Sequence, residues 1–282
     1  MRLVYFGTPA ESVPALRALV DAGHDVALVV TQPDRRRGRG SDTMPSPVKA
    51  AAVELGVPVL TPRRSREVVD EVAASGAALG VVVAFGQLLP PALLDAVPGG
   101  FVNVHFSLLP RWRGAAPVER AILAGDTETG VCIMALEAGL DTGPVYARAR
   151  IPIGDDDTAG DVTQALVEVG TRLLVSTLPV IPTLVPAPQH GDPTYADKVA
   201  VEEFELDVAS STAAELVRVV RAGNPRPGAW STVRGARVKV WHARVGDDGS
   251  FVPVEVQPEG KARMDADAWA RGLREQPPAW GT

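Results

Sequence analysis

Apolar residues in the first 130 positions follow two alternating patterns. Short continuous apolar runs, such as Leu3–Gly7 and Ala78–Phe85, indicate strands buried on both faces, as in a parallel sheet. Between these runs, apolar residues recur at helical spacing, and a glycine follows several of the helical segments. This alternation is typical of right-handed βαβ units around a mostly parallel sheet. The predicted strands cover residues 3–7, 25–31, 57–60, 78–85 and 101–107, and the predicted helices cover residues 11–22, 47–55, 65–74, a short segment near Pro90 and 116–124.

A different pattern begins after residue 130. The segments Val131–Leu136 and Val145–Ile153 predict two strands whose connection is too short for a parallel crossover, so we expect a hairpin or a loop between mixed strands. Residues 158–178 predict a long helix with a possible break at Gly170. After a proline-rich stretch the chain predicts a small β-rich unit, with helices over residues 211–222 and 265–274 and strands over residues 229–233, 237–245 and 251–256.

These patterns predict an α/β domain over residues 1–185, a linker over residues 186–202 and a β-rich domain over residues 203–282. The composition, with 46% apolar and 22% charged residues in a chain of 282, suits one large domain or two smaller ones. The N-terminus does not resemble a signal peptide, and no uninterrupted apolar run reaches the roughly eighteen residues of a membrane span. The single cysteine, Cys132, excludes an intrachain disulfide and is typical of the reducing cytoplasm.

The strand that begins at residue 101 ends in polar side chains on one face. Because side chains alternate along a strand, Asn103, His105 and Ser107 share a face, and Pro110 ends the pairing. A polar strand end capped by a turn would explain this without any function. In an open α/β sheet, however, ligands bind where the strands end at their carboxyl side. We therefore expect a site here, with His105 as the histidine placed for chemistry.

A second candidate is Asp141, which stands between two glycines in the segment Gly139–Gly143. The spacing leaves two interpretations equal: a turn aspartate that bonds its own backbone, or a carboxylate that reaches His105 and fixes its tautomer. An amide, an imidazole and a carboxylate around one cleft could direct attack at a carbonyl carbon. Asn103 would stabilise the developing oxyanion and His105 would move a proton. The sequence predicts neither a nucleophile elbow nor a metal site.

A basic loop follows the second predicted strand. The net charge of −6 for the whole chain argues mildly against a nucleic-acid partner, but this loop holds five basic and two acidic residues. Such a run of charge is usually a solvated surface, and at the rim of a cleft it could also bind a phosphate backbone. The basic residues are Arg35, Arg36, Arg37, Arg39 and Lys49.

The segment Asn-Val-His-Phe-Ser-Leu-Leu-Pro at residues 103–110, followed by Asp141, resembles the formyltransferase family that uses 10-formyltetrahydrofolate. Further segments extend the resemblance through nearly the whole chain and are similar to the methionyl-tRNA formyltransferases in that family. They are Phe-Gly-Thr-Pro near the start, Thr-Gln-Pro-Asp and Met-Pro-Ser-Pro-Val-Lys in the basic loop, Arg-Trp-Arg-Gly-Ala-Ala-Pro after residue 110, Gly-Leu-Asp-Thr-Gly, and Asn-Pro-Arg-Pro-Gly-Ala-Trp.

The resemblance implies a Rossmann-like catalytic domain and a C-terminal domain similar to an OB-fold barrel that binds tRNA. It implies transfer of a formyl group from 10-formyltetrahydrofolate to the amino group of methionine on initiator tRNA, by a cytoplasmic monomer that needs no metal. By position, it makes Asn103, His105 and Asp141 catalytic, Ser107, Leu108, Leu109 and Pro110 folate-binding, and Arg35, Arg36, Arg37, Arg39 and Lys49 tRNA-binding.

Three alternatives follow from the same sequence. The acceptor could be another amine, such as an amino-sugar nucleotide or a glycinamide ribonucleotide, and the fold could also serve a non-catalytic RNA-binding protein.

The C-terminal domain has fewer strands after Val245 than a closed barrel needs, so we expect a truncated barrel that forms an open three-stranded sheet.

Overall fold

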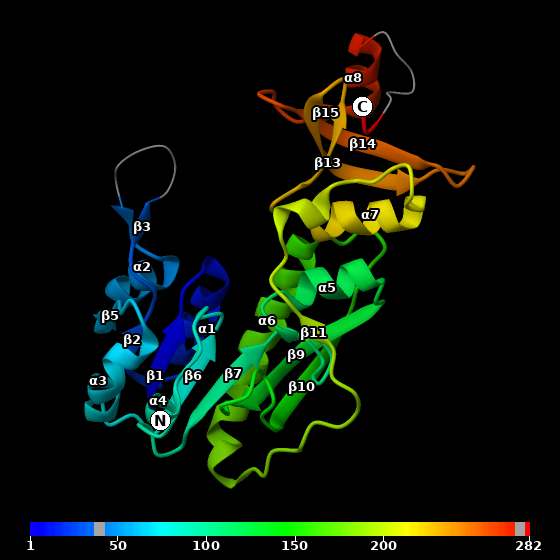
Figure 1. The fold of residues 1–282 in the computed structure, drawn as a ribbon. Helices are drawn as coiled ribbons and strands as arrows, with labels where there is room; N and C mark the ends of the chain where they lie inside the picture. Colours follow the sequence, from blue (N-terminus) through cyan, green and yellow to red (C-terminus); the bar gives the residue numbers. More distant parts are fainter. Residues whose placement is uncertain (37–42, 274–279) are drawn as a thin grey trace. The chain divides into compact units, whose positions relative to one another are not determined.

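The computed structural model describes residues 1–36, 43–273 and 280–282, with the backbone alone at residues 35 and 36. These residues fold into two compact units (Figure 1). The first unit comprises Met1–Ala115, Gly130–Ile151 and Thr163–Tyr195, and the second comprises Ala116–Thr129, Pro152–Val162 and Ala196–Thr282.

A seven-stranded sheet forms the centre of the first unit, with the strand order β10-β9-β7-β6-β1-β2-β5. The five strands from β7 to β5 pair in parallel, whereas β9 runs antiparallel to β7. The predicted mostly parallel sheet is therefore confirmed, and the two strands expected after residue 130 are neighbours at one side of it. The strands are β1 (Arg2–Gly7), β2 (Asp25–Val30), β5 (Val59–Leu60), β6 (Leu79–Val83), β7 (Phe101–His105), β9 (Glu128–Ala135) and β10 (Val145–Pro152).

Helices cover both faces of this sheet. On one face, Val72 of α3 and Leu93 of α4 belong to the same buried cluster as Phe6 and Phe101 of the strands. On the other face, the Tyr5 hydroxyl donates to the carbonyl of Ser12 at the start of α1. The helices are α1 (Val13–Asp21), α2 (Pro47–Glu54), α3 (Val69–Ala74), α4 (Pro91–Leu94) and α6 (Ala159–Thr177), with 3-10 turns at Ala10–Ser12, Ser65–Val68 and Leu178–Thr183.

The helix α6 continues through Gly170, so the break expected there does not occur. Instead, the missing side chain lets the helix approach the sheet, because a Cβ at Gly170 would lie 3.1 Å from both Val104 and Val131. Within the described residues, α6 and its 3-10 extension are long and apolar enough for a membrane span by length and composition. The core helix of a soluble protein meets the same criterion, and Leu166 and Leu174 of α6 are fully buried.

The second unit contains a small antiparallel sheet with the order β12-β13-β14-β15. The expectation of three strands is wrong by one, because the two-residue strand β15 is too short to show alternation. Among the described residues β12 and β15 are the edges, and the Leu206 amide donates to the Trp230 carbonyl beside β12. The elements are α5 (Pro117–Ala124), α7 (Ala213–Ala222), β12 (Ala229–Val233), β13 (Ala236–Val245), β14 (Phe251–Pro258), β15 (Met264–Asp265), α8 (Ala266–Leu273) and a 3-10 turn at Val201–Phe204.

Candidate active site

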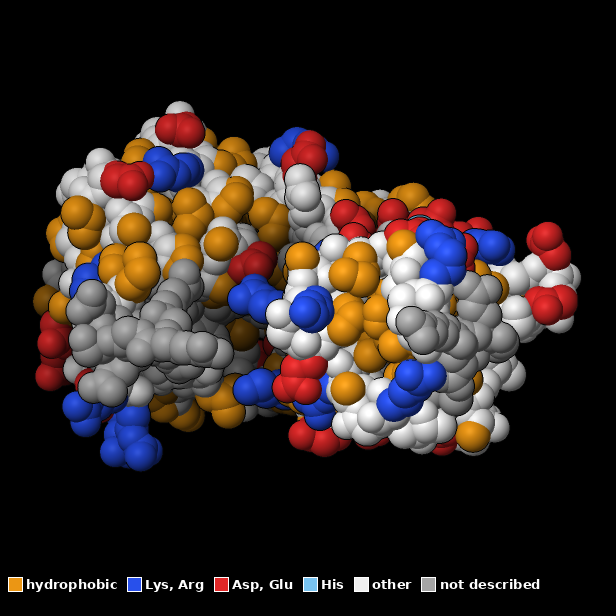
Figure 2. Space-filling view, turned by 90° about the horizontal axis from the view of Figure 1, so that it is seen from above, with side chains coloured by type: hydrophobic (Ala, Val, Ile, Leu, Met, Phe, Trp, Pro, Cys, Tyr) orange, Lys and Arg blue, Asp and Glu red, His pale blue; other side chains and the backbone are white. Residues whose placement is uncertain are grey.

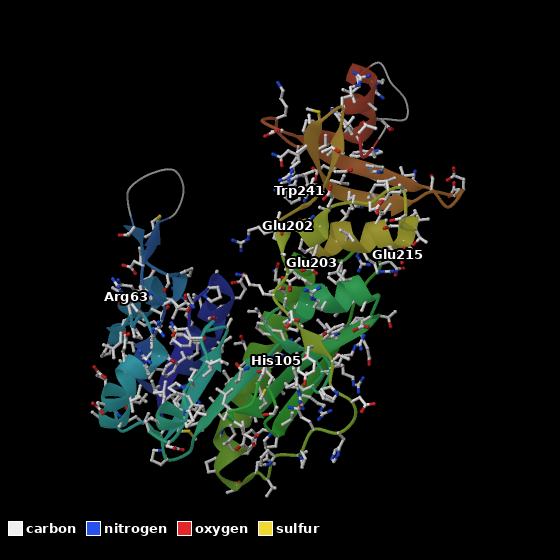
Figure 3. The ribbon with its side chains drawn as sticks, in the orientation of Figure 1. Arg63, His105, Glu202, Glu203, Glu215 and Trp241 are labelled. Carbon is white, nitrogen blue, oxygen red and sulfur yellow. The ribbon has the colours of Figure 1, made fainter. Side chains whose placement is uncertain are left out.

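His105 ends β7 and is nearly enclosed, with 5% of the residue exposed (Figure 3). Its Nε2 atom lies 2.9 Å from the carbonyl oxygen of Trp112, and its Nδ1 atom lies 3.7 Å from Oδ2 of Asp141. A carbonyl oxygen can only accept a hydrogen bond, so Nε2 carries a proton and donates it to Trp112. Nδ1 is therefore the ring atom that faces the Asp141 carboxylate.

Two residues beside the ring hold a backbone conformation that residues with a side chain rarely adopt. The φ angle is +63° at Trp112 and +48° at Asp141. The left-handed conformation costs about 1 to 2 kcal/mol at each such residue, and it persists only where neighbouring groups hold it. The Trp112 amide donates to Thr194 Oγ1 at 2.9 Å, and Oδ2 of Asp141 accepts from the Gly114 amide at 2.8 Å. Strain on both sides of one histidine indicates a functional site.

Asn103 lies two positions before His105, so both side chains are on the same face of β7. Its backbone is fixed by pairing with Val82 of β6 and Met134 of β9. The side chain is half-buried and makes no hydrogen bond to any residue in the described part of the chain. The amide N–H groups of Asn103 are therefore available to a bound molecule.

The segment predicted to bind folate, Ser107–Pro110, is only partly exposed. Ser107 is fully buried and donates to the carbonyl of Arg111 at 2.6 Å, and Leu109 packs into a buried cluster with Cys132 and Met134. Leu108 and Pro110 remain partly exposed. As the side chains are placed, this segment offers a ligand its backbone and two apolar side chains.

Sequence reasoning missed four residues that complete the site: Trp112, Gly114, Gln189 and Thr194. The Gln189 amide donates to the carbonyls of Asp141 and Gly143, at 2.8 Å each. Trp112 and Gly114 make their contacts through backbone atoms, which residue type does not reveal. Gln189 and Thr194 lie far along the sequence from His105, so no local pattern predicts that they belong to the site.

Cys132 lies opposite His105 in the pairing of β7 with β9. It is fully buried, and this burial raises the pKa of the thiol. A thiol kept neutral is a poor nucleophile. Among the described residues, no group of three His, Cys, Asp or Glu side chains is placed to hold a metal ion.

The basic loop begins with β3 (Arg35–Arg36), which pairs with β4 (Thr43–Met44). The Nζ atom of Lys49 donates to Oδ2 of Asp34 at 2.7 Å, so its charge is already paired. On the face seen in Figure 2, Lys and Arg side chains form separate patches among Asp and Glu side chains. The other predicted tRNA-binding side chains, those of Arg35, Arg36, Arg37 and Arg39, lie outside the part of the chain whose side chains are described.

Comparison with known proteins decides the family. Residues 1–178 match the formyl transferase family, and residues 198–251 match the formyl transferase C-terminal domain. The chain belongs to the formyl transferase family. This formyl transferase is 45% identical to the methionyl-tRNA formyltransferase of Ruegeria pomeroyi, and the similarity covers 96% of the chain and 97% of the relative. It is 51% identical to the methionyl-tRNA formyltransferase of Dinoroseobacter shibae, over 88% of the chain and 83% of the relative.

Solved structures share the fold of this formyl transferase at low sequence identity. The N-formyltransferase from Helicobacter canadensis, in complex with folinic acid and dTDP-3-aminofucose, has a TM-score of 0.67 at 18% identity over 87% of the chain and 88% of that protein. HypX from Aquifex aeolicus, in complex with tetrahydrofolic acid, has a TM-score of 0.70 at 14% identity over 98% of the chain and 48% of that protein. These similarities support the Rossmann-like fold of the first unit.

Proposed function

We propose that this formyl transferase moves the formyl group of 10-formyltetrahydrofolate to the amino group of methionine on initiator tRNA, which gives formylmethionyl-tRNA for translation initiation. The observation that carries the proposal is the 45% identity to a methionyl-tRNA formyltransferase along almost the full length of both chains. An amino-sugar nucleotide as acceptor has weaker support, because the N-formyltransferase from Helicobacter canadensis, whose structure holds dTDP-3-aminofucose, is only 18% identical.

The residues around His105 fit a formyl donor. The Asn103 amide is available for a formyl oxygen, and the partly exposed Leu108 and Pro110 offer apolar surface to a flat ring system. When bound, the folate supplies a formyl carbon attached to a nitrogen that leaves as an amine. We assign the backbone and side chains of Ser107–Pro110 to holding that donor.

Two side chains would act directly on the reacting atoms. Asn103 donates to the formyl oxygen as negative charge develops there, which is typically worth on the order of a hundredfold or more in rate. His105 holds a proton at Nδ1, stabilises the same developing charge and passes the proton toward the departing nitrogen. The attacking amine releases one proton as its bond to the formyl carbon forms, and this proton replaces the one that His105 gives to the departing nitrogen.

Asp141 would act through His105. Its Oδ2 atom lies 3.7 Å from Nδ1, which is longer than a direct hydrogen bond and suits a charged pair with the protonated ring. The carboxylate is itself fixed by the Gly114 amide. Asp141 therefore orients the ring.

We assign catalysis to residues 1–185, connection to residues 186–202 and tRNA binding to residues 203–282, in a cytoplasmic monomer. The second unit supports the last assignment, because the guanidinium of Arg237 lies 3.8 Å from the ring centre of Trp230 and that of Arg263 lies 3.8 Å from Trp241. Trp230 and Trp241 are themselves buried, so the stacked arginines, which are exposed, offer the tRNA positive charge for its phosphates.

The basic loop leads to a prediction about salt. Contacts from Arg35, Arg36, Arg37 and Arg39 to four phosphates would make the logarithm of the tRNA binding constant fall with the logarithm of salt concentration, with a slope of about −3. Titrating methionyl-tRNA at several salt concentrations measures this slope. Replacing Arg37 and Arg39 with glutamine should reduce its magnitude by about 1.5.

The control for that titration is Arg17→Gln, because Arg17 forms a surface ion pair with Glu54 on α2 and lies outside the loop. Its slope should equal that of the unmodified protein. A flat salt response of the unmodified protein would count against tRNA as the partner.

A transfer assay tests the proposed function. Purified protein and formyl-folate are incubated with methionyl-tRNA, uncharged tRNA, free methionine or an amino-sugar nucleotide, and the formylated product is identified by mass. Formylation of methionyl-tRNA, with little product from free methionine, supports the proposal. Preferential formylation of the amino-sugar nucleotide would replace it with the alternative.

A further inference from the structure

We propose that Gln189 is a positioning residue, whose side-chain amide holds the Asp141 loop in the conformation that places the carboxylate beside His105. This inference rests on the proposed function, in which Asp141 acts through His105. Gln189 lies in the proline-rich stretch after α6, and its side-chain hydrogen bonds go to Arg113, Asp141 and Gly143.

The Gln189 amide uses its full hydrogen-bonding capacity. Its Nε2 atom donates to the carbonyl oxygens of Asp141 and Gly143, at 2.8 Å each. Its Oε1 atom accepts from two nitrogens of the Arg113 guanidinium, Nε at 3.1 Å and Nη2 at 2.7 Å. An amide with two donor hydrogens and two acceptor lone pairs can make no more bonds than these four.

These four bonds join the two segments that contact the His105 ring. Gly143 and Asp141 belong to the loop whose carboxylate faces Nδ1, and Arg113 follows Trp112, whose carbonyl accepts from Nε2. The same two segments also meet where the Gly114 amide donates to Asp141 Oδ2. Gln189 therefore holds the Asp141 loop directly and joins it to the segment of Trp112.

The backbone of Asp141 needs such support. Its φ angle of +48° lies in the left-handed region, which an aspartate leaves readily when nothing holds it. Both carbonyl contacts of Gln189 fall within three residues of this strained position, one of them on Asp141 itself. Loss of these donors removes restraint from the loop without altering any atom of Asp141.

Thr194 supports the other side of the ring from the same stretch of chain. Its Oγ1 atom accepts from the Trp112 amide at 2.9 Å, and its carbonyl accepts from the Arg113 amide at 2.9 Å. Gln189 and Thr194 therefore each hold the backbone of one of the two left-handed residues next to His105.

Gln189→Glu is the variant that isolates the proposed role. A glutamate has the same length, still accepts from the Arg113 guanidinium and cannot donate to the carbonyls of Asp141 and Gly143. The matched control is His190→Ala, because His190 is the next residue, is exposed and has no role in the proposed mechanism. Both variants should keep the melting temperature of the unmodified full-length protein within a few degrees.

With formyl-folate and methionyl-tRNA, we expect Gln189→Glu to lower kcat by roughly 10- to 100-fold while KM for the tRNA stays unchanged, because displacing a catalytic group by about 1 Å costs up to that much. In an Asp141→Asn background, the same substitution should lower kcat by less than about threefold, since the group it positions is already lost. Undiminished kcat in Gln189→Glu, or the same fold-loss in both backgrounds, would overturn the proposal.

A measurement without turnover separates this inference from the proposed function. The ¹⁵N signals of the His105 ring, assigned by their absence in His105→Gln, should shift in Gln189→Glu and stay in place in His190→Ala. Unshifted signals would overturn the positioning role even in an active enzyme. Shifted signals in a protein that fails to formylate methionyl-tRNA would retain the positioning role and reject the proposed acceptor.

Discussion

Replacing His105 with alanine is expected to lower kcat for formyl transfer by on the order of a hundred- to ten-thousandfold. In the proposed mechanism the ring gives a proton to the departing folate nitrogen, and general acid catalysis by a positioned histidine contributes about this much. The substitution should change KM for methionyl-tRNA little, because the buried ring offers almost no surface to the tRNA. Initial rates at saturating concentrations of both substrates measure the effect.

Two further variants separate chemistry from folding in that experiment. His105→Gln retains a side-chain N–H group that can donate to Trp112 but cannot transfer a proton, so it should be nearly as slow as the alanine variant. His24→Ala is the control, since His24 follows α1 at the opposite end of the strands from the site, and it should react normally. A folded His105→Ala protein with a near-normal rate would contradict the assignment.

The parallel sheet could be predicted because its strands carry continuous apolar runs. β6 is buried at each of its five positions, and such a run permits few alternatives once helical segments flank it. The position of His105 followed from the same logic, since the polar face of β7 ends at the carboxyl edge of the sheet. The contact of His105 with Asp141 could only be offered as one of two interpretations, because the sequence of a loop does not show toward which residues its side chains point.

What could not be predicted depends on backbone geometry and on distant contacts. Trp112, whose carbonyl faces the histidine, is left-handed, and a tryptophan in the sequence gives no sign of that conformation. Prolines around Gln189 indicated an extended connection, whereas its amide makes four hydrogen bonds around the Asp141 loop. The two-residue strand β15 was missed because alternation needs more than two positions to be visible.

Asn103→Ala is expected to lower kcat by about a hundred- to a thousandfold, the usual cost of removing one donor to a developing oxyanion. KM for both substrates should change little if the amide acts mainly in the transition state. The backbone of Asn103 pairs with strands on both sides, so the shortened side chain should leave the fold intact. Steady-state kinetics, with the melting temperature as a check on folding, measure these effects.

Asn103→Asp provides the sharper comparison, because it keeps the shape of the side chain and replaces its N–H donors with a carboxylate. Negative charge next to the formyl oxygen opposes the charge that develops there, so the aspartate variant should be slower than the alanine variant. Asn103 and His105 would stabilise the same developing charge, so the double alanine variant should lose less than the product of the two single losses. An Asn103→Asp enzyme faster than Asn103→Ala would show that the amide is no oxyanion donor, and the charge would then have to be stabilised by His105 without it.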